Sequence, residues 1–136
     1  DKVKAITLHQ PWASLIAIEG KHFETRSWFP SYRGQLAIHA GKRLGVTPDG
    51  WIERWVKPLG IKDVSTLPMG VVLCVCNLVA IHYTEQLLPF LAEQEKVFGN
   101  WRPGRYAWEL EVVEVFDPPI PARGYQGLWN RERPAL

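Results

Sequence analysis

A cluster of charged and aromatic side chains in the first third of the chain has the spacing of a binding wall. Residues 23–28 alternate like a β-strand, which places Glu24, Arg26 and Trp28 on one face. Three large side chains of this kind suit the wall of a site better than a core. Lys21 lies at the turn into the strand. A guanidinium pairs bidentately with a phosphate or stacks on a base, which an ammonium group does not.

The same residues also fit a purely structural interpretation. A salt bridge among Lys21, Glu24 and Arg26 would fix the turn without binding anything. A tryptophan taken alone is more often a core residue than a stacking platform. Seven tryptophans in 136 residues is nevertheless a high number, and rings interleaved with cations suit single-stranded nucleic acid or a nucleotide. The candidate stacking platforms are Trp12, Trp28, Trp108 and Trp129.

The net charge of +2 conceals a strong segregation of charge along the chain. Residues 1–62 hold ten Lys/Arg and five Asp/Glu, whereas residues 63–121 hold three and eight. The segment 122–136 is basic again, with a balance of +2. A locally basic surface on a nearly neutral protein favours a partner with phosphates, although solvated charges without a partner would give the same pattern.

Strands interspersed with short helices predict an α+β domain. Pro11 suits a first helical turn, an apolar stripe from Trp12 to Ile18 follows, and Gly20 is placed to cap the helix. Thr84 is the expected N-cap of a later helix that Pro89 perturbs. Three prolines predict a rigid loop over residues 117–124. Strands are predicted at 4–8, 23–28, 34–40, 69–83 and 106–116, and helices at 11–20, 47–58 and 84–98.

The composition is that of one globular domain of residues 1–136. No apolar stretch reaches membrane-spanning length, and the N-terminus does not read as a signal peptide. Cys74 and Cys76 are two apart in one predicted strand, which favours buried, reduced thiols. We therefore expect a cytoplasmic protein that does not bind membranes and acts as a monomer.

The chain resembles the ASCH family at several motifs. They are LHQPWASL at 8–15, GKHFETRSW at 20–28, RGQLAIHAGKR at 33–43, GRYAWELEVVEV at 104–115 and PIPARGYQGLW at 119–129. Members of this family share a β-barrel fold with the PUA domains of RNA-binding proteins. The resemblance thus implies a small PUA-like β-barrel with flanking α-helices. It also allows a nuclear location, if the chain is a fragment of a eukaryotic coactivator.

The resemblance also raises an enzymatic alternative. Some small relatives are amidohydrolases that act on a modified cytidine with a lysine, a threonine and a glutamate. Lys21 matches their lysine, but Glu24 stands where the threonine is required, and a strand would point Thr25 to the opposite face. A Glu–Lys pair could still activate water, with Glu109 or Glu111 as a second carboxylate. The alternative is therefore a small hydrolase, amidohydrolase or nuclease-like, acting on a modified nucleoside or RNA.

The function that the sequence favours is binding of nucleic acid, RNA in preference to single-stranded DNA, in one basic, aromatic cleft. Arg33, Lys42 and Arg43 are expected to hold phosphates, and Arg26 and Trp28 to meet a base or a terminal phosphate. No phosphate-cradling glycine motif occurs, and the cysteines and histidines lack metal-ligand spacing, so neither cofactor nor metal is expected. The predicted cleft residues are Gln10, Trp12, Lys21, Glu24, Arg26, Trp28, Arg33, His39, Lys42, Arg43, Arg123, Gly124 and Trp129.

Overall fold

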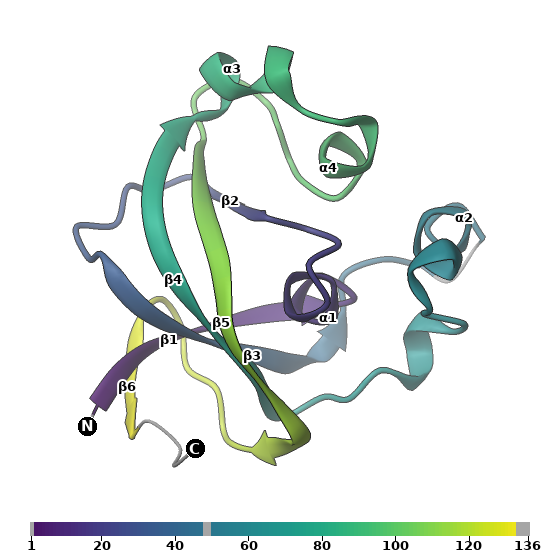
Figure 1. Ribbon diagram of the computed structural model, residues 1–136, viewed down its shortest axis with the longest axis vertical. Coiled ribbons are helices and arrows are strands. Elements are labelled where there is room, and N and C mark those ends of the chain that lie inside the picture. Colours follow the sequence, from purple (N-terminus) through teal and green to yellow (C-terminus); the bar gives the residue numbers. More distant parts are fainter. Residues whose placement is uncertain (1, 48–49, 133–136) are drawn as a thin grey trace.

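A curved six-stranded sheet forms the body of the protein in the computed structural model, which describes residues 2–47 and 50–132 (Figure 1). The strand order is β2–β5–β4–β3–β1–β6. The β1–β3 pair is parallel, and the other neighbouring pairs are antiparallel. The strands are β1 Lys2–Gln10, β2 Phe23–Arg26, β3 Gly34–Leu44, β4 Val71–Tyr83, β5 Tyr106–Pro121 and β6 Trp129–Glu132.

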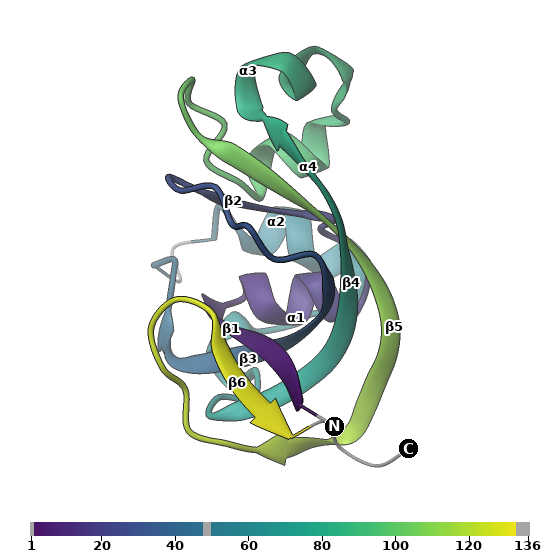
Figure 2. The same cartoon turned by 90° about the vertical axis from the view of Figure 1, so that its left-hand side faces the viewer.

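The mixed α+β class is confirmed, but the prediction of a closed barrel is wrong. Strands β2 and β6 form the two edges of the sheet. Strand β6 pairs with β1 only from Lys2 to Ala5. Within the described residues, the second half of β1 therefore has no strand neighbour on that side. The long strands β4 and β5 curve strongly, as Figure 2 shows. The two edge strands, β2 and β6, nevertheless do not pair with each other.

The helices are short and lie around the curved sheet (Figure 1). The predicted helical segments at 47–58 and 84–98 are confirmed in part. The first is helical only from Glu53, and the second divides into three short helical turns around Pro89, the residue expected to perturb it. Residues 48 and 49 of the first lie outside the described residues. The helices are α1 Trp12–Ala17, α2 Glu53–Val56, α3 Thr84–Leu87 and α4 Glu93–Val97, with 3-10 turns η1 Lys57–Leu59, η2 Val64–Thr66 and η3 Leu88–Phe90.

Helix α1 joins two hydrophobic clusters. Ile16 packs in the main core beside the fully buried Trp108, whereas Leu15 packs with Ile52 in a second cluster around α2. Trp108 is thus a core residue and not a stacking platform. Ile18, predicted to continue the apolar stripe of α1, is 47% exposed.

Two predicted helix caps are wrong. Glu19, and not Gly20, adopts the left-handed conformation after α1, with φ of 61°. Gly20 is needed for a close approach instead, because a Cβ there would lie 2.9 Å from Leu59 Cδ1. Thr84 is the first residue of α3 and its hydroxyl donates to the carbonyls of Arg102 and Arg105.

The predicted rigid loop at 117–124 begins later, because β5 continues to Pro121. Cys74 and Cys76 are buried and free, as expected. Among the described helices, none has the length and apolar character to cross a membrane.

Candidate functional site

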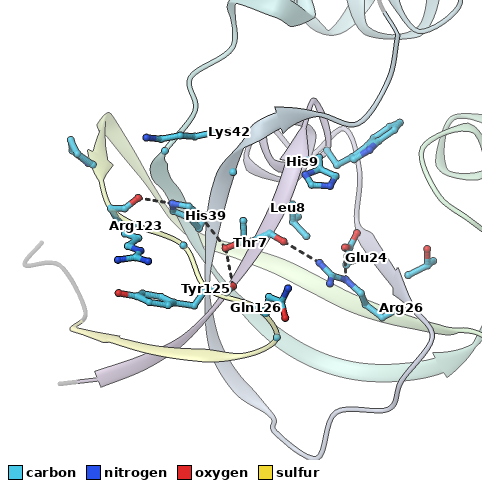
Figure 3. Close-up of a pocket in the computed structure, with 18 of the residues that line it drawn as sticks. Thr7, Leu8, His9, Glu24, Arg26, His39, Lys42, Arg123, Tyr125 and Gln126 are labelled. Atoms are coloured by element: carbon cyan, nitrogen blue, oxygen red, sulfur yellow. Dashed lines mark hydrogen bonds and ion pairs between the residues drawn. The ribbon is translucent and has the colours of Figure 1, made fainter.

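A cavity of about 1380 Å³ opens where the sheet fails to close (Figure 3). Its walls come from the second half of β1, the edge strand β2, the middle of β3 and the segment 121–127 that links β5 to β6. These elements are far apart in the sequence, and the curvature of β4 and β5 brings them together.

Arg26 and Glu24 form the β2 side of the cavity. They extend toward β1 from one face of the strand, as the two-residue period predicts (Figure 3). Arg26 Nε donates to Glu24 Oε2 at 2.9 Å, and its Nη2 donates to the carbonyl oxygen of Thr7 at 3.1 Å. The guanidinium is thereby held in one orientation across the gap between β2 and β1.

His39 forms the opposite side of the cavity, beneath the 121–127 segment. Its Nε2 lies 2.7 Å from the carbonyl oxygen of Ala122 and must donate the proton, because a carbonyl only accepts. In the neutral ring Nδ1 therefore accepts from the Thr7 hydroxyl at 3.1 Å. Burial lowers the pKa of His39, which favours this neutral form; the Ala122 bond opposes the shift and nearby Arg131 adds to it.

Gly124 lies directly over this pair. A Cβ at Gly124 would be 2.6 Å from His39 Cε1 and 2.7 Å from Thr7 Oγ1. A glycine is required because the segment passes so close to the imidazole. Tyr125 follows, with its ring 5.4 Å from the Arg123 guanidinium and 5.4 Å from the Trp129 ring. The segment thus presents a cation and an aromatic ring side by side.

The cavity walls are strongly basic. Arg26, Lys42, Arg105 and Arg123 line it, and of the described lining residues Glu24 is the one acid. Fixed cations in a concave site focus a positive potential on any anion that enters.

A second, smaller cavity of about 380 Å³ shares a wall with the first. Lys21 lines it as a buried residue, and its Nζ donates to the carbonyl oxygen of Phe98 at 2.5 Å. Burial lowers the pKa of Lys21, while the charges of Glu24 and Glu95 partly oppose this shift. The predicted cluster of three therefore divides: Arg26 pairs with Glu24, and Lys21 bonds to backbone.

Five predicted site residues do not line either cavity. Gln10 is fully buried and bonds to Ser14 and to the carbonyl of Pro68. Trp28 packs edge-on against Trp108, and Trp129 packs against His39. The last two are exposed cations outside the cavities, Arg33 and Arg43.

Eight predicted residues do line a cavity. Trp12 and Glu24 line both, Lys21 lines the smaller, and the larger adds Arg26, His39, Lys42, Arg123 and Gly124.

The main cavity is also lined by Thr7, Arg105, Tyr125 and Gln126, which were not among the predicted site residues. Tyr125 and Gln126 belong to the motif PIPARGYQGLW, so the basic and aromatic character of that loop could have indicated them. Arg105 lies in a turn with no recognisable binding motif. Its contacts with Thr84 and Thr25, which are distant in the sequence, place it at the site.

Lys21, Glu24 and Thr25, the residues that the hydrolase alternative concerns, all line the smaller cavity, although Thr25 was expected to face away from it. Each of them is engaged in another contact. Glu24 is paired with Arg26, Lys21 is bonded to Phe98, and the Thr25 hydroxyl accepts from the Asn100 backbone N–H at 3.2 Å. Glu109, a predicted second carboxylate, pairs with His82 at 2.7 Å. Over the described ranges, no three His, Cys, Asp or Glu side chains gather as a metal site would require.

Comparison with known proteins identifies the fold and the family. The ASCH domain family model matches residues 6–120. Activating signal cointegrator 1 of Mus musculus is 36% identical over 78 residues, covering 54% of this chain and only 13% of that relative. The crystal structure of a ZmASCH mutant protein from Zymomonas mobilis aligns with a TM-score of 0.52 at 18% identity, covering 87% of this chain and 74% of that one.

The structural match at such low identity concerns the fold alone, whereas the family model spans most of the chain. The resemblance inferred from the sequence motifs is thereby confirmed. The chain belongs to the ASCH domain family.

Proposed function

We propose that this protein binds single-stranded nucleic acid in the main cavity, and RNA in preference to DNA. The observation that carries the proposal is the composition of the walls: four cations surround the space and face one carboxylate. Phosphates are the anions that such a cavity suits best, because guanidinium groups match their geometry. Trp12 and Tyr125 add aromatic surface to the same walls, which is what unstacked bases need.

The shape of the site favours a single strand over a duplex. A cavity of about 1380 Å³ exceeds the roughly 300–1,000 Å³ that holds a drug-sized ligand, so it has room for a nucleotide with part of its neighbour. Bases enter a concave pocket only when they are unstacked and unpaired. A duplex would keep its bases stacked and could touch only the rim.

The preference for RNA rests on the polar groups between the cations. Thr7 and Gln126 line the cavity. The Gln126 side chain can donate and accept hydrogen bonds, and the Thr7 hydroxyl, which donates to His39, can still accept one. A ribose 2′-hydroxyl also donates and accepts, whereas deoxyribose offers no such group.

The phosphate contacts are assigned to Lys42 and Arg123. Arg26, which is held by Glu24 and the Thr7 carbonyl, adds a third positive charge to the cavity. Lys42 and Arg123 come from β3 and from the 121–127 segment, on the side of the cavity opposite β2 (Figure 3). Arg33 and Arg43, expected from sequence to hold phosphates, lie outside the cavity and are not part of the assignment.

A binding experiment tests the proposal directly. Fluorescence anisotropy would compare labelled single-stranded RNA, single-stranded DNA of the same sequence and the RNA duplex, at about 50 and 200 mM salt. We expect the single-stranded RNA to bind tightest and Arg123→Ala to weaken it. Exposed Arg43→Ala provides the matched control. Absence of binding, or equal losses in the two variants, would overturn the proposal.

A further inference from the structure

We propose that the second cavity receives one nucleobase of the bound strand and favours the imide edge of uracil. The inference rests on the proposed binding of RNA in the main cavity. The two cavities share Trp12, Glu24, Thr25 and Arg105 in their walls. A strand whose phosphates follow the basic walls can therefore direct a base across this shared boundary.

The size and the aromatic lining of the second cavity suit a base. Its volume of about 380 Å³ is at the lower end of ligand pockets, which excludes a whole dinucleotide but admits one ring. Trp12, Trp51 and Phe98 line it, and the Trp12 and Phe98 rings lie 6.2 Å apart at 56°. Trp51 is 44% exposed and extends the apolar surface outward. Stacking on such rings is worth about 1–3 kcal/mol per base.

Arg105 is the proposed recognition group, and hydrogen bonds to Thr84 and Thr25 hold its backbone and its side chain in place. Its backbone carbonyl accepts from both the N–H and the hydroxyl of Thr84, which anchors the turn. Its Nη2 donates to the Thr25 carbonyl at 3.0 Å, which fixes the guanidinium plane. Its Nε is buried and, among the described residues, has no hydrogen-bond partner. Arg105 lines both cavities, so its guanidinium presents N–H donors to a ligand at the shared boundary.

Glu24 supplies the acceptor that complements this donor. Its Oε2 accepts from Arg26, and within the part of the chain that the structure describes its Oε1 has no hydrogen-bond partner. Lys21 adds donors on the same wall, since its Nζ bonds to the Phe98 carbonyl and carries more than one N–H. The polar lining therefore offers several donors and one unused carboxylate oxygen.

This balance selects among the bases. The imide edge of uracil presents two carbonyl acceptors and a single N–H, which one carboxylate oxygen can satisfy. Cytosine and adenine present an amino group with two N–H bonds, and guanine presents a ring N–H beside an amino group. Each of these would leave a donor unpaired beside Arg105 and Lys21, and an unpaired buried donor is unfavourable.

Photocrosslinking locates the base. An oligocytidylate carrying one 5-bromouridine keeps the imide edge intact while adding a photoreactive group. After irradiation, mass spectrometry of the digested complex would identify the crosslinked residues. We expect crosslinks to Trp51 or Phe98, which line the second cavity and not the main one, whereas a crosslink to Trp12 would not distinguish the two. Crosslinks confined to Tyr125 and its neighbours in the main cavity would overturn the assignment.

Base preference provides an independent measurement. Competition anisotropy would compare oligouridylate with oligocytidylate of the same length, for the wild type and for Arg105→Gln and Glu24→Gln. We expect the wild type to prefer uridylate and each variant to lose that preference by roughly tenfold, since one hydrogen bond in a recessed site is removed. The matched controls are Arg102→Gln, an exposed cation in the turn of Arg105, and exposed Glu93→Gln.

The outcomes separate this inference from the proposed function. Tight RNA binding without uridylate preference would leave the main cavity as the binding site and refute the base subsite. A preference unchanged in Arg105→Gln and Glu24→Gln would refute the assigned residues. Failure of every RNA to bind would refute both proposals. If Arg105→Gln does not fold, Glu24→Gln and the crosslink still decide the matter, because both leave the bond from the Arg105 side chain to the Thr25 carbonyl in place.

Discussion

Arg26 Nη2 donates to the carbonyl oxygen of Thr7 at 3.1 Å, and this contact joins the edge strand β2 to the unpaired half of β1. In a closed barrel a strand would satisfy that carbonyl. Here a side chain does so, and its Nε pairs with Glu24 at the same time. One guanidinium thus fixes the gap in the sheet and orients the carboxylate that faces both cavities.

Replacing Arg26 with lysine tests this double role. An ammonium group cannot bond to Glu24 and to the Thr7 carbonyl with the geometry of the planar fork. We expect Arg26→Lys to lower the free energy of unfolding by about 1–2 kcal/mol in urea denaturation, allowing for partial exposure of the side chain. Exposed Arg33→Lys, whose guanidinium bonds within its own loop, should change stability little. Equal losses would show that the bridge contributes nothing.

The salt dependence of RNA binding tests the phosphate contacts. Each phosphate contact to a single strand contributes about 0.7 to the slope of log affinity against log salt. The double variant Lys42→Ala and Arg123→Ala should therefore reduce that slope by up to about 1.4. The double variant Arg33→Ala and Arg43→Ala also loses two positive charges, so it has the same net charge as the first double variant. We expect it to reduce the slope less. The reverse order would favour a binding surface outside the cavity.

Local periodicity was sufficient to place Glu24 and Arg26 correctly. Alternation along a strand depends on adjacent residues alone, so the two side chains share a face whatever the tertiary structure. The same reasoning did not distinguish a ligand contact from a structural bond. Gln10 and Lys21 lie within motifs and are polar, yet both are buried and bond to backbone carbonyls.

Long-range geometry explains what the sequence did not reveal. Arg105 reaches the site because Thr84 anchors its turn, and the two are 21 residues apart. Whether the sheet closes depends on how β4 and β5 curve, which no short pattern encodes. Glu19 takes the left-handed conformation beside an available glycine, because Gly20 must pass close to Leu59.

The protein should not release acetate from N4-acetylcytidine above the background rate. Glu24 occupies the position of the threonine in the amidohydrolase pattern and is paired with Arg26, so it cannot act as a hydroxyl nucleophile. Chromatographic detection of cytidine after prolonged incubation would measure turnover. Turnover that disappears in both Lys21→Ala and Glu24→Gln would instead assign the protein to the enzyme class.

The stability of the protein should fall as the pH drops below the usual pKa of histidine, in part because of His39. Burial lowers the pKa of His39 below its ordinary value of 6.5. Between the folded pKa and 6.5 the unfolded chain binds more protons, so acid favours unfolding in that window. The stabilisation is complete above 6.5 and is lost as the pH falls through the folded pKa.

A His39→Gln variant isolates that contribution, since glutamine keeps a donor for the Ala122 carbonyl but does not titrate. Urea midpoints at pH about 7.5 and about 5 would be compared for wild type and variant. We expect the variant to be less stable than wild type at the higher pH and to lose less stability on acidification. His9→Gln is the matched control, because it replaces an exposed imidazole of β1 and leaves the bonds of His39 to Thr7 and Ala122 in place. An equal loss in His39→Gln and wild type would mean that protonation of His39 is not coupled to folding.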